Sequence, residues 1–332
     1  MPNLPRPRFG RTGRSRLSAA APPEAETSRV ELIEAPGLRW VHIERPRQTD
    51  RAWLEEHFDF HPLDYEDVFS RNQRPKIDEY PEYLFIVLHF PRYDAKVGRL
   101  NAAELDVFLG PDFVVTLPNE PLQPVEYLFE RCRGNEEARD ALFSKGSGYL
   151  LYKILDDCVD AGFPMLRKMG GKLEAIETAI FQEEESREAV RDISNVKQEI
   201  INFRKIVRPQ RAVFGDLERT KNRYLPAELD LYFDDLNDAS ERIWQMLEGY
   251  KETVEALEAT NESVISHQLN DVLRFLTVLS VIFLPLTLLA SIFGMNTHVP
   301  GEQQIGGFWV VIALMVVLLV GMVAFFKRRG WL

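Results

Sequence analysis

The sequence is poor in cysteine and lacks the motifs of the common enzyme sites. Its two cysteines, Cys132 and Cys158, show no paired spacing among 332 residues. We therefore expect a reducing compartment, with neither a disulfide framework nor a zinc cluster. The chain also contains no phosphate-binding loop, no nucleophile elbow and no glycine fingerprint for a dinucleotide. These absences argue against an enzyme and against an organic cofactor.

Positive charge is in the minority, with 40 lysines and arginines against 51 aspartates and glutamates and a net charge of −11. An acidic body attracts divalent cations and disfavours nucleic acid as a partner. The start of the chain has no apolar signal core, so we do not expect secretion. Residues 1–29 are rich in proline, serine and arginine, which predicts a disordered basic tail. Contact of this tail with anionic lipid is an open alternative.

Long apolar runs occur only near the end of the chain. Leu273–Phe293 contains a single charge, Arg274, and Phe308–Phe326 contains none. Each run has about the 20 residues that a bilayer core requires of a helix. The basic residues that follow at once mark the cytoplasmic side. We therefore predict membrane spans at about 271–293 and 308–326, an extracytoplasmic loop at 294–307 and a basic cytoplasmic tail at 327–332. The N-terminus would then also lie in the cytoplasm of a cell with the protein in its plasma or inner membrane.

The polar side chains of the first span share one helix face. The face has alternating steps of three and four residues, a seven-residue repeat, and comprises Asn270, Leu273, Thr277, Ser280, Leu284, Thr287, Ser291 and Gly294. Small polar residues can merely pack helices together in lipid, and this interpretation stays open. We favour a bundle around an aqueous axis, because the stripe continues through Asn270 into a polar helix. The second spans would then face lipid.

The cytoplasmic part begins with a mixed pattern. Residues 30–135 are expected to form an α/β domain, with a helix over Arg51–Ser70. Two segments that flank the turn signal Gly110-Pro111-Asp112 should pair as a hairpin. The strand-like segments are Leu38–Ile43, Tyr83–Phe90, Leu105–Leu109 and Phe113–Leu117.

His57 and His61 lie four residues apart, a spacing that could ligate a metal on one helix face. Pro62 follows His61 and disfavours a continuous helix there. Surface histidines that bind no metal are therefore the simpler interpretation.

Helical periodicity dominates the rest of the cytoplasmic part. Residues 136–226 predict a hairpin of long helices, in which Pro209 permits a break or a kink. Pro226 can begin the next helix. Residues 227–294 contain no strong stop except Pro285, and one helix of this length would span about 100 Å. The sequence thus predicts a stalk that runs from the cytosol into the first span.

The membrane part resembles the CorA family of magnesium channels. The tripeptide Gly294-Met295-Asn296, after a proline-containing span and before a second apolar span, is the signature of that family. Arg74–Leu88 and Tyr232–Asp238 extend the resemblance upstream, so that it covers nearly the whole chain beyond about residue 30. The family usually has tyrosine before the tripeptide, where this chain has Phe293 and lacks the hydroxyl. The resemblance implies an α/β/α cytoplasmic domain, a long stalk and five copies around an axis in a homopentameric funnel. The sequence itself indicates only a parallel bundle.

The resemblance also implies a function for the stripe. It assigns the selectivity filter to Gly294, Met295 and Asn296. Magnesium sheds its bound water reluctantly, and a ring of asparagine oxygens can hydrogen-bond to those waters instead of replacing them. Glu302 in the loop would raise the local cation concentration. Asn270 would line the inner entrance. Hydroxyls of Thr277, Ser280, Thr287 and Ser291 would face the ion, and Leu273, Leu276 and Leu284 would form apolar rings that can gate by dewetting.

Regulation follows from the same resemblance. Asp94 and Asp235 match acids that sense cytosolic magnesium at contacts between subunits. The expected function is thus passive, potential-driven uptake of hydrated Mg²⁺, with Co²⁺ or Ni²⁺ as substitutes, gated by cytosolic Mg²⁺. The expected partners are other copies of the chain, the bilayer and divalent cations. Two alternatives stay open: a zinc transporter of the ZntB type, and a membrane-anchored structural or signalling bundle that conducts nothing.

Overall fold

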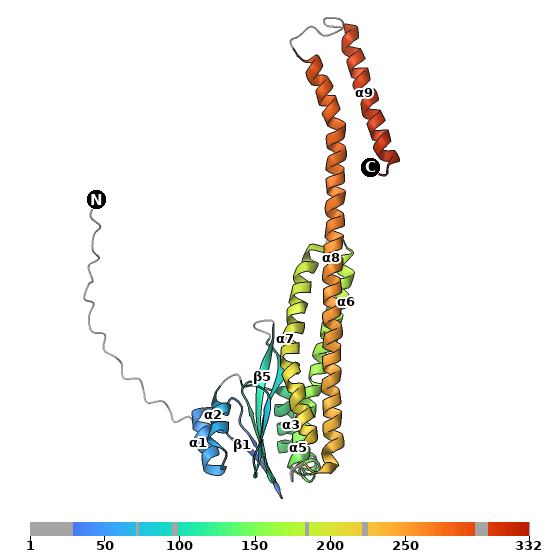
Figure 1. Cartoon of the computed structure of the whole chain (residues 1–332). Coiled ribbons are helices and arrows are strands. Elements are labelled where there is room, and N and C mark those ends of the chain that lie inside the picture. Colours follow the sequence, from blue (N-terminus) through green and yellow to red (C-terminus); the bar gives the residue numbers. More distant parts are fainter. Residues whose placement is uncertain are drawn as a thin grey trace, which may run out of the picture.

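The chain folds into a layered domain from which one long helix extends to a second helix at its far end (Figure 1). This computed structural model describes residues 29–70, 73–94, 99–182, 186–220, 225–295 and 305–331. The predicted basic tail therefore lies outside the described residues, apart from Arg29. The layered domain, the long helix and the two apolar helices expected from the sequence are all present.

A six-stranded sheet forms the middle layer. Its spatial order is β1-β2-β6-β5-β4-β3, and all neighbours are antiparallel except β2 and β6. The predicted hairpin is confirmed, because β5 pairs with β6 across the turn at Gly110. The strands are β1 Glu31–Ala35, β2 Leu38–His42, β3 Lys76–Glu79, β4 Leu84–Asp94, β5 Arg99–Leu109 and β6 Phe113–Pro118.

Both faces of the sheet are covered, which explains the unbroken apolar run of β4. Successive side chains of a strand point to opposite faces. Leu84, Ile86 and Leu88 accordingly join the core shared with α3 and α5–α8. Phe85 and Val87 join a second core beneath α1 and α2. The sheet thus lies between a thin helical layer and a thick one, and the long helix belongs to the thick layer (Figure 1).

The helix expected over Arg51–Ser70 is two helices, α1 Gln48–His57 and α2 Pro62–Phe69. His61 has extended backbone angles and caps α2, and its Nδ1 accepts a hydrogen bond from the backbone N–H of Leu63 at 3.3 Å. The break follows from Pro62, because proline disfavours the helical conformation in the preceding residue and suits the first position of a helix. Among the residues that the structure describes, no three His, Cys, Asp or Glu side chains are placed to hold a metal.

The thick layer consists of helices that continue into the stalk. Helices α6 and α7 form an antiparallel hairpin that packs along α8 (Figure 1). Pro209 lies inside α7 without ending it, so the break that this proline permits does not occur. The helices are α3 Gln123–Gly134, α4 Glu136–Phe143, α5 Ser147–Asp160, α6 Gly162–Ile180 and α7 Ser186–Arg219.

The long helix is continuous from the layered domain to the signature tripeptide. After a 3₁₀ turn at Ala227–Leu229, α8 runs over Asp230–Phe293, 64 residues, through Pro285. Its length is about 96 Å at 1.5 Å per residue. The last helix, α9 Ile305–Arg328, returns beside the far part of α8 and runs back toward the layered domain (Figure 1). Both α9 and the outer part of α8 are long and apolar enough to cross a membrane.

Substitution of Phe203 in α7 tests the packing of the thick helical layer against the sheet. Its ring is fully buried in the larger core. We expect Phe203→Ala to lower the free energy of unfolding by about 3–5 kcal/mol, because it leaves a cavity in a close-packed interior. The measurement is the thermal unfolding midpoint of the purified protein in detergent. Phe181, which is 69% exposed just after α6, is the matched control. Equal shifts for the two alanine variants would contradict this assignment of the core.

Candidate ion-conduction site

The predicted stripe is exposed along the whole outer part of α8. Every member from Asn270 to Gly294 is exposed in the single chain, and so are Leu276 beside the stripe and Met295 beyond it. Leu284, in the middle of the membrane span, is 70% exposed. No described part of the chain therefore covers the stripe, and we expect its surroundings to be lipid, water or other copies.

Helix α9 packs on a different face of α8. Val278 and Ile282 are buried there against Phe326, with Leu286 and Met322 beside them. Thr287 lies nine residues beyond Val278, about two and a half helical turns. Its side chain therefore points to the side of α8 opposite α9. A bundle with the stripes at its centre would place α9 outside, as the sequence predicts.

The hydroxyl groups of the stripe share one hydrogen-bonding arrangement. Three of them donate to the backbone carbonyl four residues earlier: Thr277 to Leu273 at 2.7 Å, Ser280 to Leu276 at 2.8 Å and Thr287 to Phe283 at 2.9 Å. A hydroxyl has one proton and two lone pairs. Because the proton is engaged by the helix, the oxygen presents lone pairs to its surroundings. Such a surface accepts hydrogen bonds from the water around a cation.

The signature tripeptide begins at the end of α8. The N–H of Gly294 donates to the carbonyl of Ala290 at 2.9 Å. A Cβ atom at Gly294 would lie 3.0 Å from that same oxygen, so glycine avoids a tight contact at this helix end. Asn296 and Glu302 lie outside the described residues, so their predicted roles remain predictions.

The two predicted regulatory acids lie on separate elements. Asp94 ends β4, opposite Arg99 in the hairpin register. Asp235 is exposed near the start of α8. The sequence did not indicate that Asp160, at the end of α5, lies in the electrostatic environment of Asp235. Burial, with Asp156 as the next cause, raises the pKa of Asp160. The carboxylate of Asp235 at the start of α8 therefore lies in the same negatively charged region as Asp156 and Asp160 of α5.

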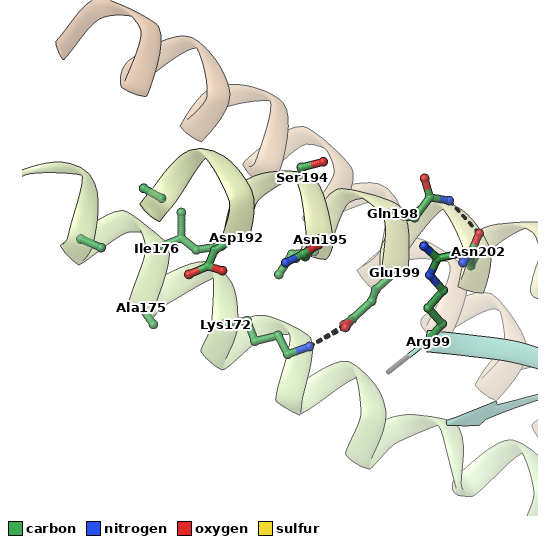
Figure 2. Close-up of a pocket in the computed structure, with 13 residues that line it drawn as sticks. Arg99, Lys172, Ala175, Ile176, Asp192, Ser194, Asn195, Gln198, Glu199 and Asn202 are labelled. Atoms are coloured by element: carbon green, nitrogen blue, oxygen red, sulfur yellow. Dashed lines mark hydrogen bonds and ion pairs between the residues drawn. The ribbon is translucent and has the colours of Figure 1, made fainter. Parts of the chain in front are cut away.

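A pocket lies away from the stripe, along the α6–α7 hairpin. Its volume is about 850 Å³. Figure 2 shows Lys172 of α6 reaching Glu199 of α7, with Nζ–Oε distances of 2.6 and 2.7 Å, while Arg99 approaches from β5. The cations and acids of this cavity largely offset each other, and none of the predicted site residues lines it.

Known proteins that are similar to this chain in sequence and structure include transporters of divalent cations. A family model described as "CorA-like Mg2+ transporter protein" matches residues 36–328. The cobalt/magnesium transport protein CorA of Thermotoga maritima is 31% identical over 315 residues, which cover 93% of this chain and 89% of that protein. The complete structure of the CorA magnesium transporter from Methanocaldococcus jannaschii matches with a TM-score of 0.77 at 21% identity, over 89% of this chain and 92% of that one.

Zinc transporters are among the more distant relatives. The zinc transport protein ZntB of Yersinia pseudotuberculosis is 20% identical, over 88% of each chain. The comparisons therefore establish a divalent-cation transporter without deciding between magnesium and zinc. Since the family model spans most of the sequence and a relative above 30% identity covers nearly all of it, the chain belongs to the CorA-like Mg²⁺ transporter family, a family of membrane metal-ion transporters and not of enzymes.

Proposed function

We propose that this protein is a passive channel for hydrated Mg²⁺, driven inward by the membrane potential, with Co²⁺ and Ni²⁺ as substitutes. The observation that carries the proposal is the row of outward-facing hydroxyl oxygens on the side of α8 opposite α9. Mg²⁺ keeps several of its waters when it binds. Those waters are hydrogen-bond donors, so a pore lined by acceptors suits them.

The channel requires several copies of the chain. One α8 cannot enclose an axis, and its stripe repeats every seven residues, the period of parallel helices that pack side by side. We infer a homo-oligomer with α8 at the centre and α9 toward lipid; the family resemblance gives five copies. Lys327 and Arg328 end α9 on the side from which α8 enters the membrane. This arrangement supports cytoplasmic termini under the positive-inside rule.

The outer mouth would select the ion. Gly294 lets the backbone approach closely, and Asn296 from each copy would contribute an amide oxygen to a ring that holds a hydrated cation. Glu302 would attract cations to this ring. Leu273, Leu276 and Leu284 would form apolar constrictions farther in. Movement of a divalent ion across 100 mV releases about 4.6 kcal/mol, so transport needs no nucleotide.

Cytosolic Mg²⁺ would close the channel. We infer that Asp94 of one subunit and Asp235 of the next hold a regulatory ion at their contact. The acids of α5 near Asp235 support this inference, because they strengthen the negative potential on that surface. Bound Mg²⁺ would favour the closed arrangement, and its loss would loosen the contacts.

Cation flux into proteoliposomes tests the proposal. With an inside-negative potential of 100 mV, we expect Mg²⁺ to accumulate on the order of 10³-fold at equilibrium, and Co²⁺ and Ni²⁺ to compete with it. Depolarised vesicles should show no accumulation. Uptake of Zn²⁺ in preference to Mg²⁺ would instead support a transporter of the ZntB type, which the distant zinc relatives keep in consideration. Vesicles silent to every cation would support a structural bundle.

A further inference from the structure

The single charge of the first membrane span contacts the C-terminus. Arg274 follows directly after the stripe residue Leu273. Its guanidinium donates a hydrogen bond to the carbonyl of Gly330 and lies 5.1 Å from the ring centre of Trp331. A cation over the face of a tryptophan is attracted by the ring. The C-terminal end of a helix also favours a nearby positive charge, because the peptide dipoles make it partly negative.

The chain after α9 is folded back to make this contact. The N–H of Trp331 donates to the carbonyl of Phe326 at 2.9 Å, and that of Gly330 to Lys327 at 3.2 Å. Gly330 has a φ of +66°, a left-handed conformation that glycine adopts without strain. Such a helix end returns the following residue onto the last turn. The Trp331 ring consequently lies 5.8 Å from that of Phe326 and under Arg274.

A general membrane role would explain these residues less well. Tryptophan anchors helices at the bilayer surface, and arginine extends toward lipid headgroups. Trp309, at the other end of α9, is 64% exposed as an anchor should be, whereas Trp331 is 43% exposed. The Nε atom of Arg274 is buried and has no hydrogen-bond partner among the described residues. Its side chain is therefore turned into the contact between α8 and α9.

We propose that Arg274, Gly330 and Trp331 form a C-terminal latch that positions the inner end of the pore helix for conduction. This inference rests on the channel function proposed above. Helix α9 lies on the side of α8 away from the stripe, so the latch ties the inner end of α8 outward. Release would let the Leu273 side chains of neighbouring copies approach one another. A narrower apolar ring sheds water and conducts less.

A double-mutant cycle in full-length protein tests the latch. We expect Arg274→Gln and Trp331→Ala each to lower Mg²⁺ uptake into proteoliposomes at least fivefold, and the double variant to fall no further than either single one. Non-additivity of this kind marks residues that act as one unit. Trp331→Phe, which keeps an aromatic face, should recover at least half of the uptake. Arg328→Gln and Trp309→Ala are the matched controls for charge and for membrane anchoring, and both should retain normal uptake.

The thermal unfolding midpoint of the assembled protein in detergent is a second readout that needs no conduction. The two single variants should lower it equally, and the double variant no more than either. Losses that add in both measurements, or control variants that lose as much uptake as the latch variants, would overturn the latch. If the wild-type protein itself takes up no Mg²⁺, the proposed function fails. The double-mutant cycle measured by the unfolding midpoint then tests only whether Arg274 and Trp331 act as one unit. Additive losses of the midpoint would overturn the latch.

Discussion

Replacement of Asn296 by alanine is expected to reduce Mg²⁺ uptake at least a hundredfold while leaving the assembly intact. The amide oxygen would accept hydrogen bonds from the water of the entering ion. A hydrogen bond to a charged group contributes about 1.5–3 kcal/mol, and each 1.4 kcal/mol in a barrier changes a rate tenfold. Every copy of the chain loses its amide at once, so the combined effect exceeds that of a single bond.

The measurement is dye-detected Mg²⁺ uptake into proteoliposomes at a fixed potential, with size-exclusion chromatography to verify assembly. Gln303→Ala is the matched control, because it removes an amide from the same loop outside the tripeptide. It should retain uptake. Normal uptake by an assembled Asn296→Ala variant would show that the ion is not selected at this ring, and the proposed filter would have to be abandoned.

Thr287→Val should lower Mg²⁺ uptake about tenfold or more. Valine keeps the branched shape of threonine and removes the hydroxyl oxygen that α8 turns outward. The Thr287 hydroxyl donates to the Phe283 carbonyl at 2.9 Å, so the lost group is an acceptor for the water of the ion. Loss of that acceptor exposes a hydrated cation to an apolar wall, which raises its energy in the pore.

Thr260 offers a close control for this substitution. It lies on the same helix outside the predicted membrane span, and its hydroxyl makes the same bond, to the Ala256 carbonyl at 2.9 Å. Thr260→Val should therefore leave uptake unchanged. If the stripe only packed helices together in lipid, Thr287→Val would weaken assembly and leave the flux per channel intact. Flux normalised to assembled protein separates the two interpretations.

Together the two substitutions examine opposite halves of the proposal. Asn296 belongs to the proposed outer ring, which rests on the family signature, whereas Thr287 belongs to a stripe that the helical period alone indicates. If Asn296→Ala lost Mg²⁺ uptake and Thr287→Val did not, the outer mouth would be selective but the pore would be lined by some other face of α8. Loss at both positions is the result expected of one continuous pathway.

Much of this architecture could be predicted from local patterns. The two apolar runs, the seven-residue stripe and the turn at Gly110 each depend on residues only a few positions apart. Because helices and strands have fixed periods, such spacing shows directly which residues share one face. Pro62 illustrates the limit: the expected helix over Arg51–Ser70 divides there. Pro209 has the opposite outcome, because the packing of α7 along the stalk keeps that helix intact through the proline.

The sequence by itself therefore determined which two segments are long and apolar enough to cross a membrane, and which face of the first of them is polar. Only the tertiary structure decided that β2 lies parallel to β6, that α9 covers the face of α8 opposite the stripe, and that Trp331 reaches Arg274. The reason is that the periodicity of a segment shows only which of its faces is apolar and which is polar. The choice of a neighbour far away in the chain depends instead on the summed packing of many side chains, which no local pattern specifies.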